Sequence, residues 1–76
     1  MSRERYTELI KGKWVVDIAN GEDGYNYYFY VGRDSSWVIM RENTAQTEYR
    51  FALGIDDLST NWADRANKNY KRTLLG

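Results

Sequence analysis

The sequence predicts a mainly β protein: a small antiparallel meander of four to five strands, or a half-open barrel. It also predicts a short N-terminal helix or arm and a helical turn near residues 59–66. Apolar and polar residues alternate in several short runs, the runs are separated by turns rich in Gly, Asn, Asp and Ser, and half of the aromatic residues lie within residues 25–41. A chain of 76 residues makes one domain. We therefore divide it into an N-terminal helix or arm at 1–12 and a single β-rich domain at 13–76.

The N-terminal segment carries Tyr6, Leu9 and Ile10 at helix-like spacing, and Gly12 follows them. An isolated helix of this length is unstable in water, so the segment must pack on the body of the protein or on a partner.

The first strand is expected at 13–19, where Trp14, Val16 and Ile18 alternate with more polar positions. The turn after it is expected at 20–24 and contains Asn20-Gly21, a pair suited to hairpins. Further strands are expected at 25–32, 37–42 and 46–53. The short polar turns between the strands indicate antiparallel pairing.

The C-terminal part should begin with a helical turn, because Asp56, Asp57 and Ser59 are capping residue types. Trp62 is expected to cover one end of the β structure, and residues 70–75 to form a last short strand or a tail. The predicted core is Trp14, Val16, Ile18, Tyr27, Phe29, Val31, Trp37, Ile39, Tyr49, Phe51 and Trp62.

Strand geometry places Tyr28 and Tyr30 on the sheet face opposite Tyr27 and Phe29. So small a domain has little material with which to cover a second face. We therefore expect Tyr28 and Tyr30 to meet another molecule.

The composition argues against an enzyme. Histidine and cysteine are absent, which removes the usual general base, the thiol nucleophile and most zinc, copper and iron sites. The acidic pairs Glu22-Asp23 and Asp56-Asp57 fit turn residues better than a calcium loop. We expect no catalytic residues, no cofactor and no metal. No apolar run is long enough to span a bilayer and the start lacks a secretion signal, so no membrane association is expected.

The net charge is zero but unevenly distributed. Residues 14–64 contain three basic and nine acidic residues, whereas Arg65, Lys68, Lys71 and Arg72 make the end basic. Such an end is typical of a solvated terminus or of an arm for an acidic partner. These four residues join Tyr28 and Tyr30 as candidate partner-binding residues. A nucleic-acid role is disfavoured, because the aromatic strand lies in an acidic segment and Asp23 stands where a base-stacking strand has a basic residue.

Two parts of the chain resemble a group of short β-rich proteins of tailed bacteriophages. The first part is Tyr49-Arg50-Phe51-Ala52-Leu53-Gly54, followed by Trp62-Ala63-Asp64-Arg65-Ala66 and Tyr70. The second is Tyr30-Val31-Gly32 with Trp37-Val38-Ile39-Met40-Arg41. The resemblance covers about residues 25–70. This chain departs from the group in a shorter loop between Gly32 and Trp37 and in Lys68-Asn69, where the group has Ser-Leu.

The resemblance implies a non-enzymatic phage protein, a structural or assembly component of the virion, found in the virion or the host cytoplasm. Its partner would be another phage protein or copies of itself. Two alternatives stay open: an early regulator or inhibitor of a host protein, and a nucleic-acid-binding module.

Overall fold

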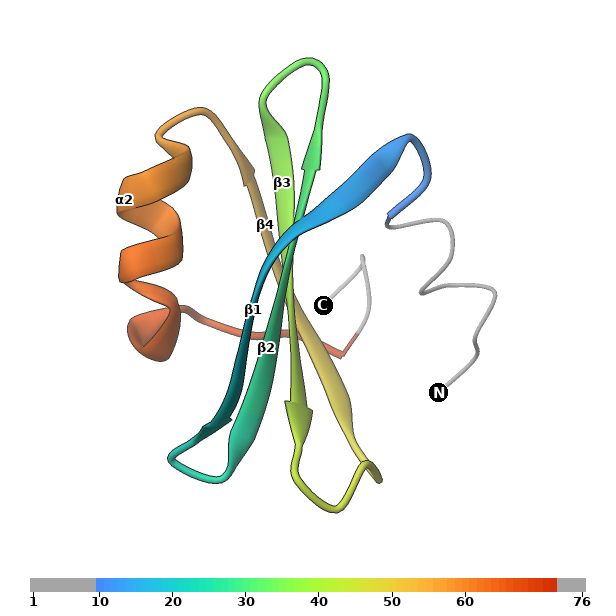
Figure 1. Cartoon of the computed structure of the whole chain (residues 1–76), viewed down its shortest axis with the longest axis vertical. Coiled ribbons are helices and arrows are strands. Elements are labelled where there is room, and N and C mark those ends of the chain that lie inside the picture. The colour runs from blue at the N-terminus through green and yellow to red at the C-terminus, as the bar shows by residue number, and fades with distance from the viewer. Residues whose placement is uncertain (1–9, 73–76) are drawn as a thin grey trace.

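The protein is a single antiparallel sheet with a short helix and a C-terminal segment on one face (Figure 1). The computed structural model describes residues 10–72. The elements are β1 (Lys13–Glu22), β2 (Tyr25–Gly32), β3 (Ser36–Asn43), β4 (Tyr49–Ile55), α2 (Leu58–Ala63) and η1 (Arg65–Asn67). Strand order in the sheet is β1-β2-β3-β4. The prediction of a mainly β meander with a helical turn near residues 59–66 is therefore confirmed, with the sheet open.

The main hydrophobic core lies between the sheet and the C-terminal part of the chain, on what we call the helix face. It contains Tyr27, Phe29, Val31, Trp37, Ile39, Ala52 and Tyr70, with Leu58 and Trp62 packed against it. A second cluster, of Tyr30, Val38, Met40 and Phe51, lies on the other side, which we call the far face. The unbroken register from Tyr25↔Asn43 to Val31↔Trp37 keeps these two sets apart.

Five predicted core residues lie in the main cluster: Tyr27, Phe29, Val31, Trp37 and Ile39. Phe51 is also buried, but in the cluster on the far face, because it pairs with Met40 rather than with Ile39. Tyr49 and Trp62 are half-buried. The predicted burial of β1 is wrong: Trp14 is 51%, Val16 49% and Ile18 48% exposed.

A β-bulge explains why β1 does not follow the predicted alternation. Val15 pairs with Tyr30 and Asp17 with Phe29, so Val16 is an extra residue with no partner position on β2. The extra residue moves Ile18 to the far face, while Trp14 stays on the helix face. Asp17, expected on the polar side, instead faces α2.

The first hairpin turns at Asp23-Gly24, inside the turn expected at 20–24 but not at its Asn20-Gly21 pair. Asp23 (φ 51°) and Gly24 (φ 85°) both take the left-handed conformation that a tight hairpin requires. β1 therefore extends to Glu22, and Gly21 (φ 69°) lies at a second register shift, between Ala19 and Glu22.

The C-terminal segment begins at Asp57, whose φ of 49° is left-handed and whose side chain makes no capping hydrogen bond to α2. The prediction of a side-chain cap there is wrong; instead Asn61 Nδ2 donates to the Asp57 carbonyl at 2.9 Å. In place of a last strand, Lys71 forms one isolated antiparallel bridge with Phe51. Most of the predicted N-terminal helix or arm, residues 1–9, and the end of the predicted last strand lie outside the described residues.

Candidate partner interface

Tyr28 and Tyr30 lie on the far face, as the strand pattern predicts, where they pair with Met40 and Val38. Their exposure differs from expectation. Tyr30 is only 7% exposed and belongs to the second cluster, and Tyr28 is half-buried. The Tyr28 hydroxyl donates to Glu42 Oε1 at 3.0 Å. The expected surface of two outward tyrosine rings is therefore reduced to part of Tyr28.

Arg65 is used inside the chain rather than at an outer surface. Its Nε and Nη2 donate to the two carboxylate oxygens of Glu22 at 2.9 and 2.7 Å, and its Nη1 donates to the Trp62 carbonyl at 2.9 Å. This hydrogen bonding raises the pKa of Arg65 and lowers the pKa of Glu22. Arg65 therefore ties η1 to the end of β1.

Trp62 holds the same segment at the middle of the sheet. Its ring stacks on Phe29 with centroids 5.0 Å apart and planes 6° apart. Its Nε1 donates to Asp17 Oδ2 at 3.0 Å, and the Arg65 guanidinium lies 4.4 Å from its ring centroid. The Trp62-Ala63-Asp64-Arg65-Ala66 motif thus fastens the C-terminal segment to β1 and β2. This is a structural role, but Trp62 lies over the middle of the helix face and does not cover one end of the β structure as expected.

Tyr70 completes this attachment. Its side chain is buried in the main core, and its hydroxyl donates to the Arg65 carbonyl at 2.7 Å. Burial raises the pKa of the Tyr70 phenol well above its usual range, and burial also raises the pKa of Tyr27.

The remaining basic candidates differ from one another in their surroundings. Lys68 donates to the Asn61 side-chain oxygen, and its ammonium lies 3.8 Å from the Asp64 carboxylate and 5.4 Å from the Trp37 ring centroid. Lys71 and Arg72 are exposed. Of the four basic candidates, two are thus held by contacts within the chain, and two remain available at the surface.

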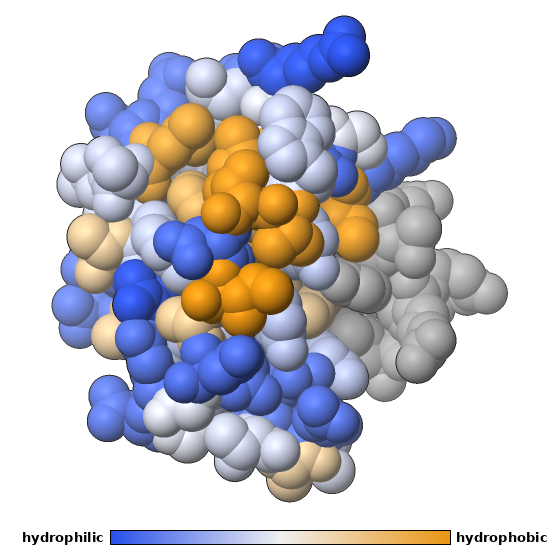
Figure 2. Space-filling view, viewed as in Figure 1, coloured by the Kyte–Doolittle hydropathy of each residue, from blue (hydrophilic) through white to orange (hydrophobic). Residues whose placement is uncertain are grey.

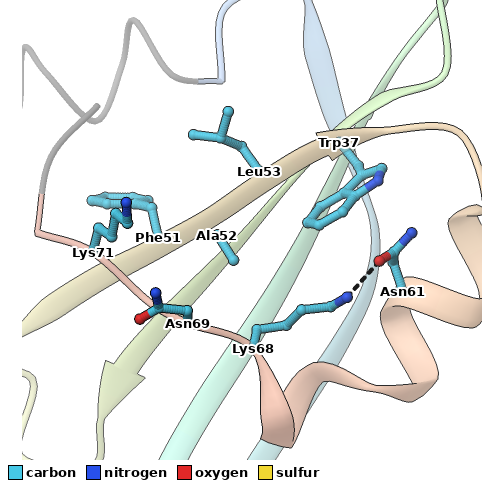
Figure 3. A pocket seen from close by; sticks show the side chains of 8 residues that line it. All are labelled: Trp37, Phe51, Ala52, Leu53, Asn61, Lys68, Asn69 and Lys71. Carbon is cyan, nitrogen blue, oxygen red and sulfur yellow. Dashed lines mark hydrogen bonds between the residues drawn. The ribbon is translucent and has the colours of Figure 1, made fainter. Parts of the chain in front are cut away.

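A cavity of about 520 Å³ lies between β4 and the C-terminal segment (Figure 3). It is lined by Trp37, Phe51, Ala52, Leu53, Asn61, Lys68, Asn69 and Lys71. Figure 3 shows Lys68 reaching across toward Asn61 below the Trp37 ring. The volume falls in the range of small-molecule sites. However, of the two lysines that line it, Lys68 is already engaged by Asn61 and Asp64.

Sequence reasoning missed a run of exposed apolar side chains on one strand, which we call the β1 strip: Trp14, Val15, Val16 and Ile18. Each of its side chains is between 42% and 51% exposed. Figure 2 shows apolar atoms gathered at the middle of the viewed face, where β1 crosses in front of the sheet in Figure 1. The missed signal is the uninterrupted run Trp14-Val15-Val16, which is typical of a strand covered on both faces rather than on one.

Within residues 10–72 no group of three or more His, Cys, Asp or Glu side chains is placed to hold a metal ion. No helix in this part of the chain is long and apolar enough to cross a membrane. In comparisons with protein-family models, with curated proteins and with solved structures, the chain matches none.

Proposed function

We propose that this chain is a small non-enzymatic bacteriophage protein, a structural or assembly component of the virion that acts through protein–protein contacts. The observation that carries the proposal is the β1 strip. Four large apolar side chains on one strand are about half exposed, and contiguous apolar surface of this kind is typical of protein interaction sites.

The phage assignment depends on the resemblance, and the positions of the resembling residues support it. Trp62, Arg65 and Tyr70 hold the C-terminal segment on the sheet through Phe29, Glu22 and the main core. Related chains with the same fold would need these contacts, whatever their partners are. The motif is therefore expected to mark the fold and not one particular partner.

The two alternative functions have less support in the geometry. A nucleic-acid-binding module would use the basic residues near the C-terminus, yet Arg65 pairs with Glu22 and Lys68 contacts Asn61 and Asp64. Base stacking on Tyr30 would need more exposure than 7%. A host-directed inhibitor would use the acidic middle of the chain, where Asp17 and Glu22 already bind Trp62 and Arg65.

The test is mass spectrometry of density-purified particles from the phage or prophage that encodes the chain. We expect the protein to remain with intact particles, or with assembly intermediates, after a high-salt wash. Recovery only from the soluble fraction of infected cells, bound to a host protein, would instead support the inhibitor. A salt titration with single-stranded DNA provides the second arm: binding that weakens as salt rises would favour the nucleic-acid module.

A further inference from the structure

The β1 strand occupies an edge of the sheet but has the sequence of an inner strand. Among residues 10–72 it pairs with β2 alone, and the β1 strip exposes apolar side chains toward both sides of the sheet. Edge strands in monomeric proteins are usually short, charged, bulged or interrupted by proline. β1 carries charges and a bulge at Val16, but it is ten residues long, the chain contains no proline, and the run Trp14-Val15-Val16 has no charge.

The opposite edge of the sheet is different, and this difference limits the choice of partner. At β4, the Phe51 amide donates to the Lys71 carbonyl at 2.6 Å, and the Lys71 amide donates back at 2.8 Å. The C-terminal segment thus already occupies part of the β4 edge. A contact from β1 of one molecule to β4 of the next would compete with this bridge, whereas a contact from β1 to β1 would not.

The charges along β1 suit pairing with a second copy of itself. Lys11 and Lys13 lie just before and at its start, and Glu22, which keeps its pair with Arg65, lies at its end. Antiparallel pairing about a two-fold axis brings the start of each strand to the end of the other, so the lysines of each copy lie near Glu22 of the other copy and away from each other.

The bulge at Val16 determines the register in which facing side chains of the two β1 strands point to the same side of the joined sheet. Val15 and Ile18 lie on the far face, and Trp14 and Ala19 lie on the helix face. Facing residues of an antiparallel pair point to the same side. A two-fold axis at the bulge therefore sets Val15 opposite Ile18 of the second copy and Trp14 opposite Ala19 of the second copy.

We propose that two copies of this chain pair antiparallel through the outer edges of their β1 strands, which joins two four-stranded sheets into one. This inference rests on the proposed function, action through protein contacts, and names a second copy as the partner. The pairing buries the β1 strip against the strip of the second copy.

Pairing has one local requirement. The Ile18 amide donates to the Asp17 side-chain oxygen Oδ1 at 2.8 Å. On pairing, this amide must give up that hydrogen bond and donate instead to a backbone carbonyl of the second copy. Exchanging one hydrogen bond for another has a small net free-energy change. Apolar burial along the β1 strip therefore provides the driving force for association.

Sedimentation equilibrium of the full chain tests the proposal. We expect a species of twice the 9.0 kDa chain mass at micromolar concentration. Ile18→Lys sets a lysine from each copy near the axis and should raise the dimer Kd by about 100-fold. The matched control is Ile55→Lys, at a 63% exposed site on β4, which should leave the Kd within about 2-fold. Circular dichroism of each variant confirms that it is folded.

Three results would overturn the proposal. The first is a wild-type monomer throughout the concentration series. The second is equal disruption by Ile18→Lys and Ile55→Lys, and the third is a series of ever larger oligomers, which is the signature of head-to-tail contacts. A monomer that still co-purifies with phage particles would end this inference and leave the proposed function standing. A dimer that is absent from particles would support this inference and contradict the proposed function.

Disulfide trapping tests the register, because the chain has no cysteine of its own. Val15→Cys and Ile18→Cys chains are mixed in equal amounts and oxidised. Disulfide bonds should form mainly between unlike chains, since these two positions face each other across the axis. Predominant bonding between like chains would refute the register.

Discussion

Trp14 and Trp62 contact the same face of the sheet, yet their surroundings are opposite. Trp62 stacks on Phe29, binds Asp17 and carries the Arg65 guanidinium over its ring. Trp14 lies on the helix face opposite Val31 but is 51% exposed. The difference teaches that a tryptophan in an amphipathic strand need not belong to the core of its own chain. Trp62 packs within the monomer, whereas Trp14 leaves about half of its surface exposed.

Replacing each tryptophan by alanine should separate these roles, and Trp62→Ala should have the largest effect on folding. It removes the stack on Phe29 and the hydrogen bond to Asp17, so the free energy of unfolding should fall by about 3 kcal/mol. Trp14→Ala should lower it by less than about 1 kcal/mol. Urea denaturation at low protein concentration, followed by circular dichroism, measures both. Equal losses would show that Trp14 is also part of the core.

Gly54→Ala should have the next largest effect, because it disturbs the third tryptophan. A Cβ at Gly54 would lie 2.5 Å from the Trp37 ring atom Cζ2. The rigid ring would have to shift and strain its Nε1 hydrogen bond to the Asp56 carbonyl, now 3.1 Å. We expect a loss of about 2 kcal/mol, measured by thermal denaturation.

Gly32→Ala is the control for that substitution. A Cβ added at Gly32 would lie 2.9 Å from the Ser36 hydroxyl oxygen. The Ser36 hydroxyl can rotate away more easily than the Trp37 indole can shift. The loss at Gly32 should therefore be the smaller of the two. The opposite order would show that Trp37 has room to adjust.

The buried phenol of Tyr70 should make the C-terminal attachment sensitive to alkali. Because burial raises its folded-state pKa above the ordinary value of 10.0, the stability it contributes is fully present below pH 10 and is lost as the pH rises toward the folded-state pKa. Unfolding measured at increasing pH should show this loss, and it should be smaller in Tyr70→Phe. An identical pH dependence in both proteins would assign the effect to other tyrosines, Tyr27 first among them.

The smallest effect should come from Glu22 at acidic pH. The hydrogen bonds from Arg65 lower the folded-state pKa of Glu22 below its ordinary value of 4.5. The stability from this pair is therefore present above about pH 4.5 and is lost as the pH falls through the folded-state pKa. Glu22→Gln should remove part of the acid dependence of unfolding.

Glu48→Gln is the comparison for the loss of an ion pair. Among the described residues Glu48 pairs with Arg50, two residues away. That pair joins positions already close in sequence, so its loss at neutral pH should lower the free energy of unfolding less than the loss of the Glu22–Arg65 pair. A larger effect from Glu48 would mean that Arg65 does not tie η1 to β1 in solution.

The middle of the sheet could be predicted from the sequence because β2 and β3 alternate without interruption. Tyr27, Phe29, Trp37 and Ile39 could all be assigned to the core from period-two spacing alone. The helical turn after β4 could also be predicted, since the apolar alternation stops where capping residue types begin.

The edge strand and the candidate site could not be predicted in the same way. A bulge has no side-chain signature of its own, and without it Ile18 falls on the same side as Trp14. The pairs Glu22–Arg65 and Asp17–Trp62 join residues more than forty positions apart, which local pattern cannot detect. The burial of Tyr30 was missed because the far face forms a cluster of its own with Val38 and Phe51.

The extra residue at Val16 has a consequence for recognising distant relatives of this chain. A homologue with a straight first strand would be one residue shorter here, so a correct alignment must open a gap at Val16. Without that gap, Asp17, whose carboxylate binds the Trp62 indole, would be aligned with a residue that points to the far face. A search that penalises gaps inside strands would then lose the residues before Val16, even where the rest of the chain aligns.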